Sequence, residues 1–264
     1  MLNPAQALAA ANRPRVRAVS SQRRVLVLGG GGVLGSQVVE RLLSGQRFAH
    51  VGVWTVQPLQ PALRGLEPVS EADWPAFAPD TAVVVFDRER HANGRDLAFG
   101  RALPDELAAR AAQLHRLGVA TLIVVVPHAP GALPQALKAG LATLDEGAVA
   151  ALGFRHLVFM RSAQAVTAAP DGRSPPERLA QWMLGQLQWM VPQRDQPVRS
   201  ATVARVAARL AAGLPASAPG TRVLPPELLW AAAQSPKTDH AVDAWLDGVA
   251  PEAIPDVPLT RQRW

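Results

Sequence analysis

Four consecutive glycines, Gly29 to Gly32, interrupt an apolar stretch near the start of this 264-residue chain. The residues before them, Val25 to Leu28, are continuously apolar and predict a short buried strand. The residues after the glycines place apolar side chains at helical spacing, at Leu34, Val38, Val39, Leu42 and Leu43. Glycine has no Cβ, so it adopts positive φ freely and lets a ligand approach the backbone. The stretch therefore predicts a strand, a glycine turn and a helix in direct succession.

The spacing of the glycines matches a turn that binds the pyrophosphate of a dinucleotide. Gly30, Gly32 and Gly35 form GxGxxG, whereas Gly29, Gly32 and Gly35 form GxxGxxG. A strand before the motif and a helix after it are the context in which such a motif binds a dinucleotide. We therefore expect these glycines to hold the pyrophosphate. A turn that only packs the helix onto the sheet is the alternative.

Four further residues are expected around the dinucleotide. Val33 and Leu34 begin the helix, and the first turn of a helix offers free N–H groups and a partial positive charge to a pyrophosphate. Phe86 and Val126 end two later strands of the predicted sheet, at the edge where ligands bind. We expect these two side chains to flank the adenine or the nicotinamide.

The end of the second predicted strand, His50 to Val56, bears on the choice between NAD and NADP. An NAD-specific fold usually has an acidic residue there, which accepts a hydrogen bond from the ribose 2′-hydroxyl. This chain has no acidic residue between Arg41 and Leu66, so no carboxylate from that stretch repels a 2′-phosphate. We therefore expect NADP to be preferred slightly over NAD, with Gln57 or Arg64 as partners of the phosphate.

The rest of the chain alternates between apolar strands and amphipathic helices. Strands are predicted at 66–69, 81–86, 119–126 and 156–160, and helices over 104–117 and 135–152. This alternation predicts a Rossmann-like α/β fold, in which a doubly wound parallel sheet has helices on both faces. A charged loop, residues 87–91, follows one strand at the edge where such sheets bind ligands.

We predict one domain with a small helical C-terminal portion. Residues 1–22 form a basic extension that is expected to be flexible, 23–162 the dinucleotide-binding core, 163–249 the helical portion of the same domain, and 250–264 an irregular tail. A helix predicted over 177–190 carries Met and Trp side chains that could floor a substrate pocket, although core packing or a dimer contact is favoured. A homodimer or another protein partner is thus an open alternative.

The positive charge of the chain is concentrated near its start. The net charge is +6, and five arginines lie before or at the first strand, at Arg13, Arg15, Arg17, Arg23 and Arg24. This basic arm lacks the motifs and interleaved aromatic residues of a nucleic-acid-binding segment, so a nucleic-acid partner is not expected. The arm has no long apolar core, so we do not expect it to be a secretory signal, and no apolar run in the chain approaches the length of a membrane span. We expect a cytoplasmic protein, with an organellar presequence as the less favoured alternative.

Two absences limit the chemistry. The chain has no cysteine, which excludes disulfides, thiolate catalysis and cysteine-based metal sites. Its six histidines lack the spacing of metal ligands, so no metal is expected. The chain also has no tyrosine.

The order of these pieces resembles the atypical short-chain dehydrogenase/reductase family, and within it the NAD(P)H-binding, oxidoreductase-like TIP30 proteins. Three segments carry the resemblance: GGGGVLG at 29–35, LGVATLIVVV at 117–126, and ALGFRHLVFMRS at 151–162, which SPPERLAQWM follows at 174–183. The resemblance covers most of residues 22–235. It implies a Rossmann-like fold that binds NAD(P).

The same resemblance implies that the catalytic groups of the family are replaced here. Active members use a Tyr as acid or base, a Lys four residues later and a Ser that orients the substrate carbonyl. The family's pattern places Lys138 at the Tyr position and Ala142 at the Lys position. The serine region is Val126-Pro127-His128.

Three accounts of the function remain open. In the first, the protein binds NAD(P) and is non-catalytic or weakly catalytic. In the second, it is an NADP-dependent oxidoreductase with relocated groups, in which His128 exchanges protons and Lys138 or Arg161 polarises a carbonyl. In the third, it is a protein-interaction scaffold whose nucleotide site is empty. The small-molecule substrate is unknown in all three.

Overall fold

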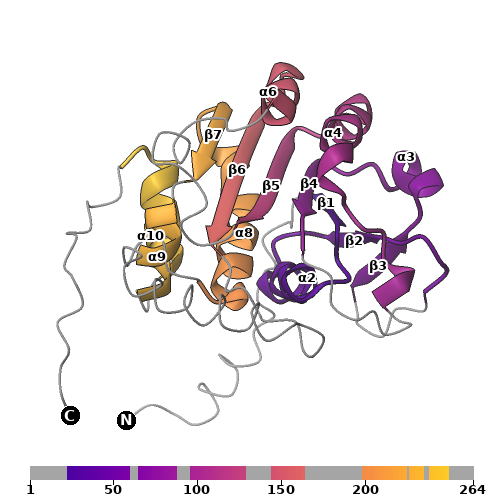
Figure 1. Cartoon of the computed structure of the whole chain (residues 1–264), viewed down its shortest axis with the longest axis horizontal. Coiled ribbons are helices and arrows are strands. Elements are labelled where there is room, and N and C mark those ends of the chain that lie inside the picture. Colours follow the sequence, from indigo (N-terminus) through magenta and orange to yellow (C-terminus); the bar gives the residue numbers. More distant parts are fainter. Residues whose placement is uncertain are drawn as a thin grey trace, which may run out of the picture.

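A parallel sheet organises the part of the chain that the structure describes. The computed structural model describes residues 23–59, 65–87, 96–128, 144–163, 198–224, 226–234 and 238–249. The strands are β1 (Arg24–Leu28), β2 (His50–Trp54), β3 (Leu66–Val69), β4 (Thr81–Val85), β5 (Thr121–His128), β6 (His156–Ala163) and β7 (Gly220–Leu224). They lie in the order β3-β2-β1-β4-β5-β6-β7, and all neighbours are parallel (Figure 1). This confirms the predicted Rossmann-like, doubly wound α/β fold.

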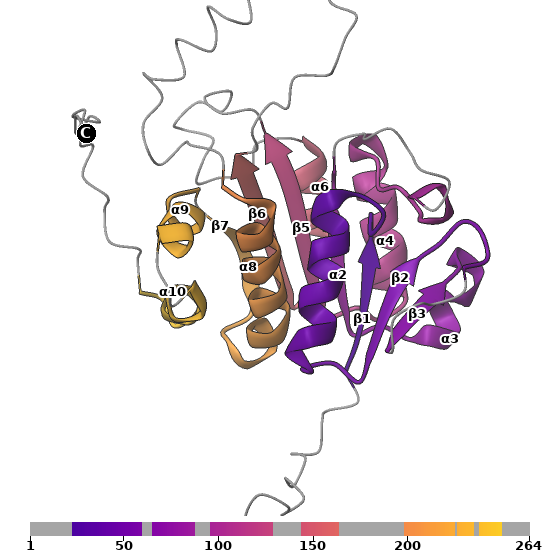
Figure 2. The ribbon, with the colours of Figure 1, turned by 90° about the horizontal axis from the view of Figure 1, so that it is seen from below.

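Helices cover both faces of the sheet. One face carries α2 (Val33–Gly45), α8 (Ser200–Gly213), α9 (Pro226–Gln234) and α10 (Thr238–Leu246), and the other carries α3 (Trp74–Phe77), α4 (Leu107–Arg116) and α6 (Leu144–Ala151). Helices α2 and α8 pack side by side, as Figure 2 shows. None of the helices in the described ranges combines the length and the hydropathy needed to cross a bilayer.

The strand before the glycines shows how the sequence fills both faces. Val25 and Val27 belong to the core under α2 and α8, whereas Leu26 and Leu28 belong to the core under α3 and α4. Successive side chains of a strand point to opposite faces, and all four are fully buried. A strand that is buried on both faces must be apolar throughout, which explains the unbroken apolar run.

Some predicted elements differ from the observed ones. The helix predicted from Pro104 begins with a 3-10 turn, η3 (Pro104–Glu106), before α4. Of the helix predicted over 135–152, the structure shows α6, while residues 135–143 and the helix predicted over 177–190 lie outside the described residues. Within the helical portion predicted over 163–249, no separate helix is predicted at α10. Its buried residues Thr238, Val242 and Leu246 recur at helical spacing and would have indicated it.

Two arginines of the basic arm are bound to the domain. Arg23 donates from Nη2 to the Ala211 oxygen (2.7 Å) and from Nη1 to the Ala212 oxygen (3.1 Å), near the C-terminal end of α8. Arg24 donates from Nη1 to the oxygen of Phe77, which ends α3 (2.9 Å). The helix dipole favours a cation at the carboxyl end of a helix. Both guanidinium groups therefore stabilise helix ends inside the folded domain.

The first residue of β6, His156, has a buried imidazole. Its exposed fraction is 1%, and its backbone pairs with β5 on one side and β7 on the other. Burial, reinforced by the positive charges of Arg155 and Arg222, lowers the pKa of the His156 imidazole below its ordinary value of 6.5. The folded protein therefore holds this imidazole neutral at a pH where the unfolded chain protonates it.

We expect the free energy of unfolding to fall as the pH drops below about 6.5, because the unfolded chain then binds a proton that the folded chain does not bind. The contribution of His156 is fully present above the unfolded pKa and is lost towards the lowered folded pKa. Urea denaturation of the wild type and of His156→Gln, between about pH 7.5 and about pH 5, measures it. The slope of stability against pH should be smaller in the variant. Equal slopes would contradict this role of His156.

Candidate functional site

The glycine turn joins the carboxyl end of β1 to the start of α2. Strand β1 lies between β2 and β4, and the strand order reverses there, because β2 and β3 continue to one side and β4 to β7 to the other. In open α/β sheets the crevice at such a reversal is the usual ligand position. The sequence therefore places its glycine turn at the position in the fold where a ligand is expected.

Steric contacts show why the turn is built from glycines. Gly29 has a φ of +84°, and a Cβ on it would lie 2.1 Å from the Val85 oxygen. A Cβ on Gly35 would lie 1.9 Å from the Gly29 oxygen, so that glycine lets α2 pack directly on the turn. A Cβ on Gly30 would lie 2.5 Å from Val53 Cγ1. Gly29, which only the GxxGxxG spacing includes, thus supplies the positive φ of the turn.

A carboxylate from the end of β4 lies at the N-terminus of α2. Gly32 precedes the helix with extended backbone and provides no side-chain cap, and the first turn has no acidic residue. Asp87 supplies the missing negative charge, since its Oδ2 accepts a hydrogen bond from the Leu34 N–H (2.7 Å). A Cβ on Gly32 would lie 2.2 Å from the same oxygen. The N–H that was expected to face a pyrophosphate therefore already binds an anion.

A second segment crosses the carboxyl ends of β1 and β2. Residues 96–100, which we name the strap, lie there between β4 and α4 in the sequence. The Gly29 N–H donates to the Gly100 oxygen (3.2 Å), the Gly100 N–H donates to the oxygen of the last residue of β2 (2.9 Å), and the Val56 N–H donates to the Ala98 oxygen (2.9 Å). The ribose of a dinucleotide contacts the ends of these two strands in Rossmann folds. The strap therefore covers part of the surface on which a ribose would lie.

The remaining candidates for dinucleotide contact are spread around this edge. Phe86 is buried in the core under α3 and α4, and Val126 packs against the same core while half-buried. Gln57 exposes its side chain, and its N–H donates to the strap. Arg64 lies outside the described residues. Val33 begins α2 beside Leu34, as predicted.

Of the three candidate catalytic residues, the structure describes the side-chain contacts of Arg161. Arg161 of β6 is bound by Glu146 of α6: Nη2 lies 2.7 Å from Oε2, and the two side chains are 2% and 5% exposed. Its cation thus takes part in a buried ion pair. His128 ends β5, where its backbone pairs with Ala163. Lys138 lies outside the described residues.

Sequence reasoning missed both carboxylates of this region. It included Asp87 only as part of a charged loop, and it assigned no role to Glu146. Asp87 meets Leu34 across 53 positions of sequence. No periodicity links two residues on different elements, so neither contact could be inferred. The signal that existed was the position of Asp87, two residues after the end of a strand at the ligand-binding edge.

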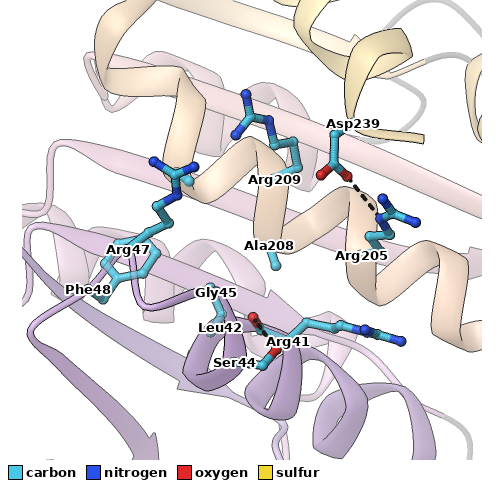
Figure 3. A pocket seen from close by; sticks show the side chains of 11 residues that line it. Arg41, Leu42, Ser44, Gly45, Arg47, Phe48, Arg205, Ala208, Arg209 and Asp239 are labelled. Carbon is cyan, nitrogen blue, oxygen red and sulfur yellow. Dashed lines mark hydrogen bonds and ion pairs between the residues drawn. The ribbon is translucent and has the colours of Figure 1, made fainter. Parts of the chain in front are cut away.

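A cavity of about 240 Å³ lies elsewhere, between α2, α8 and α10 (Figure 3). Its charged lining includes Arg41, Arg47, Arg205, Arg209 and Asp239. Arg205 donates to Asp239 (2.9 Å). Because Arg41 lies in the second half of α2 and Arg47 follows the helix, this cavity lies toward the end of α2 that is opposite to the glycine turn. In the described ranges, no group of three or more acidic or histidine side chains could hold a metal ion.

Comparison with known proteins gives distant structural matches. No family model matches the chain, and no curated protein matches its sequence. The UDP-glucose 4-epimerase of Brucella ovis, solved in complex with NAD, is 16% identical, with a TM-score of 0.44 over 77% of each chain. The Bordetella bronchiseptica enzyme WbmH, in complex with NAD⁺, is 15% identical, with a TM-score of 0.45 over 89% of this chain and 83% of that one.

A third match is the UDP-N-acetylglucosamine 4-epimerase of Bacillus cereus. It is 10% identical, with a TM-score of 0.44 over 84% of this chain and 92% of that one. This chain is a distant structural match to Rossmann-fold epimerases. The narrower resemblance to the atypical, TIP30-like branch stays a prediction.

Proposed function

We propose that this protein binds a pyridine dinucleotide at the glycine turn. The observation that carries the proposal is the position of the turn: it opens α2 at the point where the strand order reverses between β1 and β4. There the chain combines a backbone without Cβ atoms, a helix N-terminus and the carboxyl edge of a parallel sheet. The pyrophosphate would lie against Gly32, with the Leu34 N–H as a donor once Asp87 has moved away.

Within this proposal, NADP is preferred slightly over NAD. The stretch after β2 offers exposed polar groups and no carboxylate, since Gln57 is exposed and the first acidic residue after Arg41 is Glu67. A 2′-phosphate there would meet no repulsion from that stretch. Gln57 and Arg64 are its proposed partners.

The protein is proposed to be non-catalytic or weakly catalytic, because it cannot carry out the Tyr-dependent proton transfer of the family that it resembles. The chain has no tyrosine, and the cation of Arg161 is engaged by Glu146. A reductase that uses His128 and Lys138 instead is the alternative. NADPH oxidation in the presence of a panel of aldehydes and ketones distinguishes the two, because only the alternative expects turnover that is lost in His128→Ala.

Calorimetric titration with NADPH, NADP, NADH and NAD at fixed salt tests the binding itself. We expect micromolar affinity for at least one nucleotide, and an affinity at least about tenfold lower for Gly32→Asp, because the new carboxylate repels the pyrophosphate. The backbone at Gly32 is extended (φ −82°, ψ 178°) and Asp is a favoured residue before a helix, so the variant should fold once the Asp87 side chain, whose Oδ2 would lie 2.2 Å from the new Cβ, has turned aside. A melting curve of the variant checks this. Failure of both the wild type and Asp87→Ala, which lacks the carboxylate beside Gly32, to bind any of the four nucleotides would refute the proposal.

A further inference from the structure

We infer that Asp87 holds the glycine turn in a form that excludes the pyrophosphate, so that a dinucleotide binds only after this carboxylate has left the N-terminus of α2. The inference concerns the regulation of the proposed site and rests on the proposed function. It makes Asp87 an autoinhibitory residue, which determines how tightly the site takes its ligand.

The position of the carboxylate carries the first step. Asp87 Oδ2 accepts the Leu34 N–H at 2.7 Å, a distance typical of a charge-assisted hydrogen bond. The same oxygen lies 2.2 Å from the point where a Cβ of Gly32 would be. The carboxylate therefore fills the space beside Gly32 that the absence of a side chain leaves open. A phosphate oxygen that used the Leu34 N–H would need the same space.

Electrostatic repulsion between the Asp87 carboxylate and a pyrophosphate is the second reason why the two exclude each other. A pyrophosphate is an anion, and a carboxylate within a few ångströms of it opposes its binding. The N-terminus of α2 carries a partial positive charge that favours an anion, and the Asp87 carboxylate already occupies this position. The two anions therefore compete for the Leu34 N–H and for the partial positive charge at the N-terminus of α2. Binding of one requires displacement of the other.

The connection between β4 and α4 supplies a third contact. Near its start, Asp87 binds Leu34 on one side of the turn, and near its end Gly100 accepts the N–H of Gly29 on the other side. Gly100 also packs closely, because a Cβ on it would lie 2.1 Å from Trp54 Cδ2. The glycine turn is thus held at both ends by one connection. Release of Asp87 is the step that frees the pyrophosphate position.

The test compares Asp87→Ala and Asp87→Asn with the wild type by titration with the four nucleotides. Asp87→Ala removes both the charge and the acceptor, whereas Asp87→Asn removes the charge and keeps an acceptor for Leu34. We expect Asp87→Ala to bind the preferred nucleotide at least about tenfold more tightly, with Asp87→Asn between it and the wild type. Asp105→Asn is the matched control, because it removes one exposed carboxylate from the η3 turn. It should bind like the wild type.

Melting without ligand gives a second readout. Asp87→Ala should melt at a lower temperature than the wild type, because the N-terminus of α2 loses its anion, and the nucleotide should raise its melting temperature by a larger amount. A purely structural role would lower the stability and leave the affinity unchanged or weaker. If Asp87→Ala does not fold, Asp87→Asn decides by the same comparison.

The outcomes separate the inference from the proposed function. Tighter binding in the Asp87 variants supports both, including the case in which the wild type shows no detectable binding. Measurable binding by the wild type with equal or weaker binding by the folded variants overturns the inference and leaves the proposed function intact. Binding by neither the wild type nor the folded variants overturns the proposed function, and the inference with it.

Discussion

Replacing Glu146 by Gln is expected to lower the free energy of unfolding by about 3–5 kcal/mol. Arg161 Nη2 lies 2.7 Å from Glu146 Oε2, and the two side chains are 2% and 5% exposed. The substitution keeps the shape of the side chain and removes its charge. The guanidinium of Arg161 then loses the charge of Glu146 at a position that is 2% exposed to water. Urea denaturation measures the loss.

Two further variants make this result specific. Asp239→Asn removes the carboxylate of an exposed pair, in which the Arg205 and Asp239 side chains are 42% and 45% exposed, and should cost less than about 1 kcal/mol. Glu146→Gln combined with Arg161→Met removes both charges and should recover more than half of the loss. If Glu146→Gln were no more damaging than Asp239→Asn, the buried pair would have no stabilising role, and Arg161 would again be a candidate for substrate contact.

Replacing Gly35 by Ala is expected to cost about 3 kcal/mol of stability and to abolish the proposed nucleotide binding. A Cβ at this position would lie 1.9 Å from the Gly29 oxygen, 2.9 Å from the Gly29 carbonyl carbon and 3.0 Å from Gly30 Cα. All three neighbours are main-chain atoms, so no flexible side chain can move to relieve the contact. Helix α2 must shift away from the turn, which separates its N-terminus from the glycines. Thermal and urea unfolding measure the first effect, and calorimetry the second.

Gly147→Ala is the matched control for this substitution. Gly147 lies inside α6, and a Cβ there meets no atom within 4 Å. Alanine has the higher helix propensity, so this variant should gain roughly 0.5–1 kcal/mol. If Gly35→Ala lowers the stability and Gly147→Ala raises it, contact with the turn, and not loss of glycine as such, causes the damage at Gly35. Wild-type stability in Gly35→Ala would mean that the turn does not need this close approach.

Much of the fold could be predicted because the residue pattern of each strand shows whether its two faces are buried. Val25 to Leu28 and Thr81 to Val85 have no charged residue, since both of their faces are buried, and this pattern belongs to a parallel sheet covered by helices. The glycine spacing located the turn and the start of α2 in the same way. Helix α10 was missed although its spacing was visible, and the exact start of α4 was missed because a 3-10 turn precedes it.

The candidate site likewise has one part that the sequence predicts and one part that it does not. The residues of the glycine turn, Gly29 to Gly35, are neighbours in sequence, so their spacing already defined the geometry of the turn. Asp87 and the strap reach that turn from another part of the chain. Their contacts depend on which strand lies beside β1 and on how the connection after β4 crosses the sheet edge.

The order of residues along the chain accordingly predicted the parallel sheet, its two apolar faces and the glycine turn. Burial repeats at a known period within a single element, and backbone freedom is likewise a property of a single element, so both can be read from the sequence. Tertiary structure alone decided that the Leu34 N–H binds Asp87 and that Arg161 is buried against Glu146. These are contacts between charged or polar groups on different elements. They carry no periodic signal, and they arise only when packing of the apolar faces has set the distance between the elements.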